Sequence, residues 1–141
     1  MSDFVLDNSV AMRWHLESEK ASDQKYAESV LISLADVDAV VPNLWHLEAT
    51  NVLLGAEKRG DSTTGEVERF IDQLERLPLH VDPLTANKSF SRIMALARAY
   101  KLSSYDAAYL ELAVREGLPI ATLDKDLIKA AKKADVEIHL K

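Results

Sequence analysis

The stretch Pro119-Ile120-Ala121-Thr122-Leu123-Asp124 is a short apolar run that ends in an acid. The same arrangement occurs near the N-terminus, where Phe4-Val5-Leu6 is followed by Asp7. Short apolar runs of this kind are typical of buried strands, and ligands of parallel α/β sheets bind beyond the carboxyl ends of the strands. If these two strands are neighbours, the sheet brings Asp7 and Asp124 together from opposite ends of the chain.

Between the two runs, short apolar segments alternate with segments of helical periodicity, which predicts an α/β fold with a largely parallel sheet. We expect strands at 4–6, 39–41, 79–81, 120–123 and 136–140. We expect helices at 10–16, 23–35, 44–58, 63–76, 86–100, 103–116 and 127–134. The helices at 44–58 and 63–76 have no strand between them and would stand over the sheet as a hairpin. Thr63 and Glu66 form a capping-box signature for the second of them.

Length and composition indicate one soluble domain spanning residues 1–141, with 48% apolar and 28% charged residues. The absence of cysteine excludes a disulfide scaffold and thiolate metal sites. No segment approaches the roughly 20 apolar residues of a membrane span, and the N-terminus lacks the pattern of a secretory signal. We therefore expect a cytoplasmic protein that does not associate with membranes.

The net charge of −6 argues against a nucleic-acid-binding protein, which normally presents a basic surface. Two bound divalent cations would bring this charge from −6 to −2 and reverse the local field where a phosphate approaches. Net charge alone therefore does not decide whether the protein binds nucleic acid.

Two further acids lie on predicted helices where a solvated acid is not expected. Glu48 is on the opposite side of its helix from His46 and Thr50, and Asp106 shares a face with Leu110. Burial of an acid costs free energy unless a cation or a hydrogen-bond partner compensates it. We therefore expect a cation or a hydrogen-bond partner beside each of these two acids.

Converging carboxylates raise one another's pKa unless a cation holds them ionised, so these acids predict a divalent-metal site. Ligation by oxygen alone favours Mg²⁺ or Mn²⁺ over zinc. Helix capping is an equally common explanation for three of the acids. Asp7 and Asp124 could each cap the helix that follows, and Ser103 with Asp106 resembles a capping box. Glu48 has no such explanation.

Four segments of the chain resemble the PIN-domain ribonucleases, and most closely the toxins of VapBC-type toxin–antitoxin pairs. They are Val5-Leu6-Asp7-Asn8-Ser9, residues 42–53 with Glu48 and Asn51, Ser104-Tyr105-Asp106-Ala107-Ala108-Tyr109, and Ala121-Thr122-Leu123-Asp124-Lys125-Asp126. Each segment alone is a weak signal. Their order and spacing are fairly specific, and together they span nearly the whole chain.

The resemblance implies a three-layer α/β/α fold with a mainly parallel central sheet and an acidic pocket that binds Mg²⁺ or Mn²⁺ and cleaves RNA. The acidic quartet of the family matches Asp7, Glu48, Asp106 and Asp124. Ser9 matches a hydroxyl residue that supports the first Asp, and Asn51 matches a polar residue beside the Glu. Asp126 is a candidate fifth acid, although an ordinary first-turn acid explains it better. Implied partners are an RNA substrate, a cognate antitoxin protein and a second copy of the chain.

The expected mechanism is metal-assisted hydrolysis of a phosphodiester. Asp7 and Asp106 would hold the principal metal, while Glu48 and Asp124 would complete the pocket or place a second ion, and one of these two would orient the water. Candidate phosphate contacts are Arg13, Lys58, Arg59, Lys101 and Lys125, for which an ordinary surface position is the commoner explanation.

Two other functions compete with this interpretation. A phosphatase could use Asp7 as nucleophile, but haloacid-dehalogenase-like enzymes have a second acid two residues later, where this chain has Ser9. A non-catalytic interaction module could line a groove with Trp14, Trp45 and Tyr26. The intact quartet argues against loss of catalysis.

Overall fold

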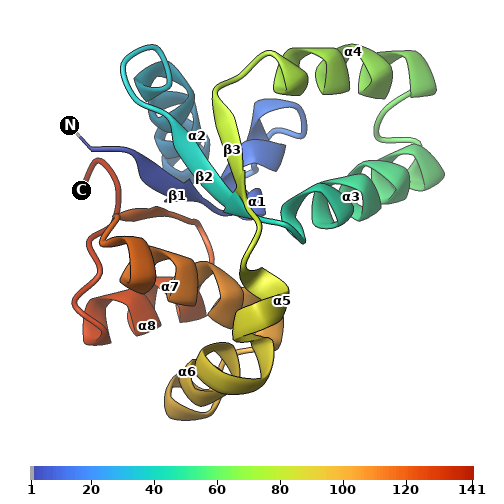
Figure 1. Ribbon diagram of the computed structural model, residues 1–141. Coiled ribbons are helices and arrows are strands. Elements are labelled where there is room, and N and C mark those ends of the chain that lie inside the picture. The colour runs from blue at the N-terminus through green and yellow to red at the C-terminus, as the bar shows by residue number, and fades with distance from the viewer. Residues whose placement is uncertain (1) are drawn as a thin grey trace.

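A four-stranded parallel sheet forms the centre of the computed structural model, which describes residues 2–141 (Figure 1). The strands are β1 (Phe4–Leu6), β2 (Ala39–Pro42), β3 (Leu79–Asp82) and β4 (Ile120–Ala121), in the order β3-β2-β1-β4. Val5 pairs with Val40 on one side and with Ile120 on the other. The two strands from opposite ends of the chain are therefore neighbours, and their carboxyl ends meet at one edge of the sheet.

Helices cover both faces of this sheet, as expected for a three-layer α/β/α fold. They are α1 (Asn8–Ala11) with the 3-10 turn η1 (Met12–Trp14), α2 (Ala21–Ser33), α3 (Trp45–Arg59), α4 (Thr64–Glu75), α5 (Thr85–Lys88), the π-helical turn η2 (Ser89–Ile93), α6 (Met94–Tyr100), α7 (Ser104–Glu116) and α8 (Lys125–Lys133). Figure 1 shows α2 on one side of the sheet and α7 with α8 on the other. No helix within 2–141 is long and apolar enough to cross a membrane.

The predicted hairpin of α3 and α4 is confirmed and extends from the edge of the sheet in Figure 1. Gly60 ends α3 in the left-handed conformation, with φ of 80°. The predicted capping box opens α4, because Thr63 Oγ1 accepts from the Glu66 amide and Glu66 Oε1 accepts from the Thr63 amide. Glycine and capping box together set the sharp turn between the two helices.

The expected strand at 136–140 is wrong, because this segment forms only an isolated parallel bridge between Ile138 and Ile120. The Ile120 amide donates to Glu137 O, and the His139 amide donates to Ile120 O. Asp135 and Leu140 have φ values of 58° and 66°, so the backbone turns at both ends of the segment. The chain therefore touches the edge of β4 without extending the sheet.

Two other elements differ from the sequence-based expectation. The helix expected over 86–100 consists of α5, η2 and α6 in succession. The strand expected over 120–123 ends at Ala121, because Thr122 and Leu123 leave the ladder and bond to side chains at the end of β1. This second departure shapes the functional site.

The core combines the buried side chains of β1 and α7 with those of α2, α3 and α4. Phe4, Val5 and Leu6 of β1 are fully buried, as are Tyr109 and Leu110 of α7. Burial of one such large apolar side chain contributes about 1.5–3 kcal/mol. Because α7 is packed so completely, the acid in its first turn is held at a defined position beside the sheet.

Candidate metal centre

Asp7 is a buried carboxylate at the carboxyl end of β1, with 6% of its surface exposed. Its Oδ2 accepts hydrogen bonds from Ser9 Oγ and from Thr122 Oγ1, each at 2.7 Å. Asp7 precedes α1, but in the described structure its side chain makes no capping hydrogen bond. The helix-cap explanation is therefore wrong for Asp7, whose carboxylate is bound by two neutral hydroxyls.

The hydroxyls of Ser9 and Thr122 join the ends of β1 and β4. Thr122 Oγ1 accepts from the Asp124 amide at 3.0 Å, and Ser9 Oγ accepts from the Leu123 amide at 3.0 Å. Ser9 is predicted from the sequence, whereas Thr122, which is 1% exposed, is not. The available signal was a hydroxyl inside an otherwise apolar run, two residues before an acid.

Glu48 lies in the first turn of α3 and is half-buried. The hydroxyl of Tyr109, a fully buried residue of α7, donates to Glu48 Oε1. Tyr109 has no predicted role in the site, although it follows Asp106 by three residues. Asn51 is exposed, and within 2–141 its side chain makes no hydrogen bond to Glu48. The polar neighbour of Glu48 is thus Tyr109.

Asp106 and Asp124 each begin a helix. Ser103 caps α7 by accepting from the Asp106 amide at 3.1 Å, while the reciprocal bond of a capping box is not formed in the described chain. Asp124 Oδ1 accepts from the Leu127 amide at 2.9 Å, so the capping explanation is correct for one oxygen of Asp124. Asp126 is exposed in the first turn of α8.

The pKa of Asp7 is raised from 3.8 to about 6, chiefly because burial disfavours the charged carboxylate. The negative charges of Glu48 and Asp124 raise it further, whereas the hydroxyls of Ser9 and Thr122 lower it. The hydrogen bonds therefore offset only part of the cost of burying this acid.

The pKa of Asp106 is also raised to about 6, first by burial and then by the charges of Asp124 and Asp7. Burial raises the pKa of Glu48, as does the charge of Asp106, and the bond from Tyr109 opposes this shift. Each of these acids thus lies within electrostatic reach of others in the set. The structure brings Asp7, Glu48, Asp106 and Asp124, hereafter the acidic quartet, to one edge of the sheet.

No Lys, Arg or His within 2–141 forms an ion pair with a member of the quartet. As the side chains of these residues are placed, no three His, Cys, Asp or Glu groups lie close enough to hold one ion. Because the donors are all oxygens and lack a positive partner, the set fits a hard ion such as Mg²⁺ or Mn²⁺.

The model of the family described as PIN domain matches residues 4–133 of this chain. Solved structures with a similar fold include PAE2754 from Pyrobaculum aerophilum, with a TM-score of 0.66 and 19% identity over 92% of this chain and 87% of that chain. FitAcB from Neisseria gonorrhoeae gives a TM-score of 0.51 and 18% identity over 98% of this chain and 96% of that chain. A search of curated proteins gives no significant match.

Proposed function

The chain belongs to the PIN domain family, and on that basis we propose that it is a metal-dependent endoribonuclease. PIN domains are generally nucleases that use divalent metal ions. The observation that carries the proposal is the convergence of the acidic quartet, two members of which have pKa values near 6, without a basic partner among residues 2–141. Hydroxyls and a phenol orient these acids, which is the arrangement expected around metal ligands.

In the proposed mechanism, Asp7 and Asp106 are the principal ligands, and Glu48 and Asp124 complete the pocket. A divalent ion bound here lowers the pKa of water and neutralises charge on the phosphate. Ser9 and Thr122 fix the orientation of the Asp7 carboxylate through their bonds at 2.7 Å. Glu48 or Asp124 orients the attacking water.

We also propose that the protein is the toxin of a type II toxin–antitoxin pair, acting as one cytoplasmic domain over residues 1–141. An antitoxin protein would bind near the quartet and place a basic side chain among the acids, and the toxin would form a homodimer. Exposed apolar side chains provide surface for such contacts. The most exposed are Phe90, Ile32, Leu47 and Tyr105, of which Phe90 is 92% exposed.

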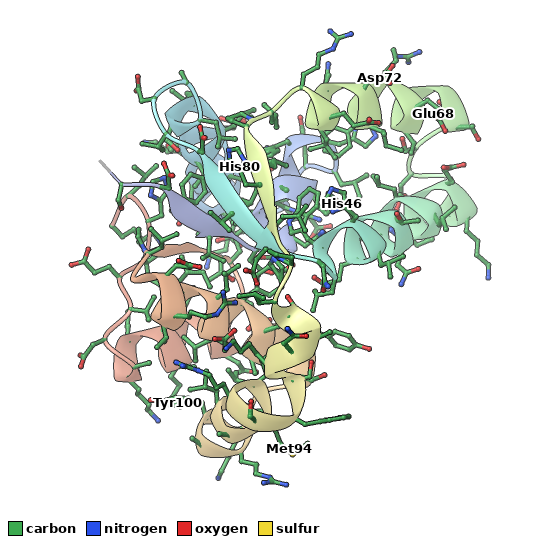
Figure 2. All side chains as sticks on the ribbon, viewed as in Figure 1. His46, Glu68, Asp72, His80, Met94 and Tyr100 are labelled. Atoms are coloured by element: carbon green, nitrogen blue, oxygen red, sulfur yellow. The ribbon has the colours of Figure 1, made fainter. Side chains whose placement is uncertain are left out.

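A groove of about 360 Å³ between α3 and α4 adds to this apolar surface and is lined by Trp45, His46 and Ile71. Figure 2 shows His46 on the side of α3 that faces this space, while Glu68 and Asp72 project from the outer side of α4. The aromatic groove expected for an interaction module is not formed, because Tyr26 is buried and donates to His139 O.

The first test is a calorimetric Mn²⁺ titration of the wild type, Asp106→Asn and Asp126→Asn, with folding checked by circular dichroism. The wild type should bind Mn²⁺ saturably and Asp106→Asn should lose binding while staying folded. Asp126→Asn removes an exposed acid of the neighbouring helix and should keep binding, which makes it the matched control.

Two results would change the assignment. Failure of the wild type to bind Mn²⁺ would remove the metal centre and leave a non-catalytic interaction module as the better function. Equal loss in both variants would make Asp126 a ligand and would extend the site to five acids.

A further inference from the structure

A second site adjoins the quartet in the form of a groove of about 340 Å³ between α6 and α8. Tyr100 and Lys101 line it from the end of α6, and Lys129 and Lys133 line it from α8. Figure 2 shows Tyr100 on the side of α6 turned toward α8, whereas Met94 lies at the far end of α6. The groove thus combines an aromatic ring with three cations.

The groove lies beside the acidic quartet. Asp126, two residues after Asp124, lines the groove and is close enough to Asp106 for its charge to raise the pKa of that carboxyl. Lys101 precedes Ser103, the residue that caps the helix of Asp106. A polymer lying in the groove would therefore pass near Asp106.

The lysines of the groove are available to a ligand. Within 2–141, none of Lys101, Lys129 and Lys133 forms an ion pair, and all three are exposed. Lys129 and Lys133 are one helical turn apart and project from the same face of α8. Against the single acid Asp126, these three cations make the groove locally positive in a chain whose net charge is −6.

We propose that this groove binds the phosphate backbone of single-stranded RNA next to the cleavage site. The inference rests on the proposed nuclease function, since it extends the substrate site of that reaction. Cations that follow a backbone, together with an aromatic ring on which a base can stack, are the usual features of single-strand binding. An acidic peptide would also satisfy the lysines, but it has no base to stack on the ring of Tyr100.

The test measures the fluorescence anisotropy of a labelled single-stranded RNA of mixed sequence over a range of salt concentrations. It uses the Asp106→Asn protein in EDTA, so that binding needs neither metal nor cleavage. Replacing Lys129 and Lys133 by Gln should weaken binding about tenfold and lower the slope of log affinity against log salt by about 1.4, since each phosphate contact in a single strand contributes about 0.7.

Two further variants separate this effect from loss of charge or of fold. Lys20→Gln with Lys25→Gln removes two exposed cations at and within α2, away from the groove, and should change affinity less than about twofold. Lys101→Gly should lower the salt slope by about 0.7, and it suits the backbone because Lys101 has a left-handed conformation with φ of 56°.

Three outcomes would overturn the proposal. Equal weakening by the α2 pair would mean that only net charge matters. Displacement of the RNA by a poly-glutamate peptide at lower concentration than by unlabelled RNA would assign the groove to a protein partner. Absence of RNA binding, combined with a normal Mn²⁺ titration of the wild type, would remove the groove as an RNA site and leave the metal centre standing.

Discussion

Helix α7 contributes one acid to each of two acid groups, which differ in whether the chain supplies a positive partner. In its first turn, Asp106 faces the other acids of the quartet with no basic partner among the described residues. Further along, Glu111 is 1% exposed and bonds to Arg115, which also binds Asp82 at the end of β3. Arg115 donates to both oxygens of Asp82, at 3.0 and 2.8 Å.

Charge compensation distinguishes the two groups: compensated acids indicate a structural role, and uncompensated acids indicate a site for a cation. Asp82 and Glu111 raise the pKa of Arg115, and Arg92 lies 3.6 Å from Glu111, so two arginines compensate the two buried acids. The quartet has hydroxyl and phenol donors but no cation from the chain. The quartet is not neutralised by an arginine as the other group is. A cation from solution can therefore bind there and stabilise the ionised carboxylates.

The largest effect is expected from Arg115→Met, which would leave Asp82 buried without a counterion and Glu111 with only the partly exposed Arg92, at 3.6 Å. Removing one member of a buried ion pair typically costs about 3–5 kcal/mol, and urea unfolding at neutral pH would measure this loss. The control is Arg59→Met, because Arg59 and Asp61 form an exposed pair that contributes less than about 1 kcal/mol. A similar loss in both variants would mean that the buried network is not what stabilises this end of α7.

In the Arg115 network charged side chains stabilise the fold, whereas in the quartet ionisation of the carboxylates should destabilise the metal-free protein. Because the pKa of Asp7 rises from 3.8 to about 6 on folding, the native state binds more protons than the unfolded state between these values. The free energy of unfolding should therefore fall as pH rises from about 4 to 6, by about 3 kcal/mol for Asp7 alone. Asp106 acts in the same direction.

Urea unfolding in EDTA at about pH 4 and about pH 7.5 would measure most of this change in stability. Asp7→Asn cannot ionise at this position and should have a flatter profile. Mn²⁺ should stabilise the wild type more at the higher pH, where the carboxylates are ionised. A metal-free protein that is equally stable at both values would contradict the view that the quartet is an uncompensated acid group.

The edge of the sheet where Asp7 and Asp124 meet could be predicted from sequence, because both acids end apolar runs and parallel strands end at a common edge. The helix hairpin followed from periodicity and from the capping box at Thr63. These features depend on local pattern. The pairing of β1 with β4, on which the meeting of Asp7 and Asp124 depends, was only a condition of that prediction and is established by the structure.

The remaining features depend on contacts across the fold. Tyr109 binds Glu48 across 61 positions of sequence, and Asp82 binds Arg115 across 33. On α7, Glu111 and Arg115 have the spacing of an ordinary surface pair, so sequence did not distinguish a buried network from an exposed one. The segment 136–140 is apolar enough for a strand, but the turns at its two ends leave it only a bridge to β4.

The smallest effect is expected from removing one of the hydroxyl groups that donate to Asp7. Thr122→Val keeps the shape of a side chain that is 1% exposed but removes the hydroxyl bonded to Asp7 Oδ2. Groups that orient a metal ligand typically contribute about 10–100-fold in metal affinity, so the Mn²⁺ dissociation constant should rise by that factor. The pKa of Asp7 should rise further, since the lost bond stabilised its charged form.

Thr122→Ser is the matched control, because it keeps the hydroxyl and should retain most of the Mn²⁺ affinity. Its missing methyl leaves a small cavity, so it should lose stability while binding metal nearly normally. Equal Mn²⁺ affinity in the Val and Ser variants would show that the hydroxyl only joins β4 to β1. In that case Thr122 would have a structural role and would not orient a metal ligand. The acidic quartet would then resemble the Arg115 network more closely than proposed.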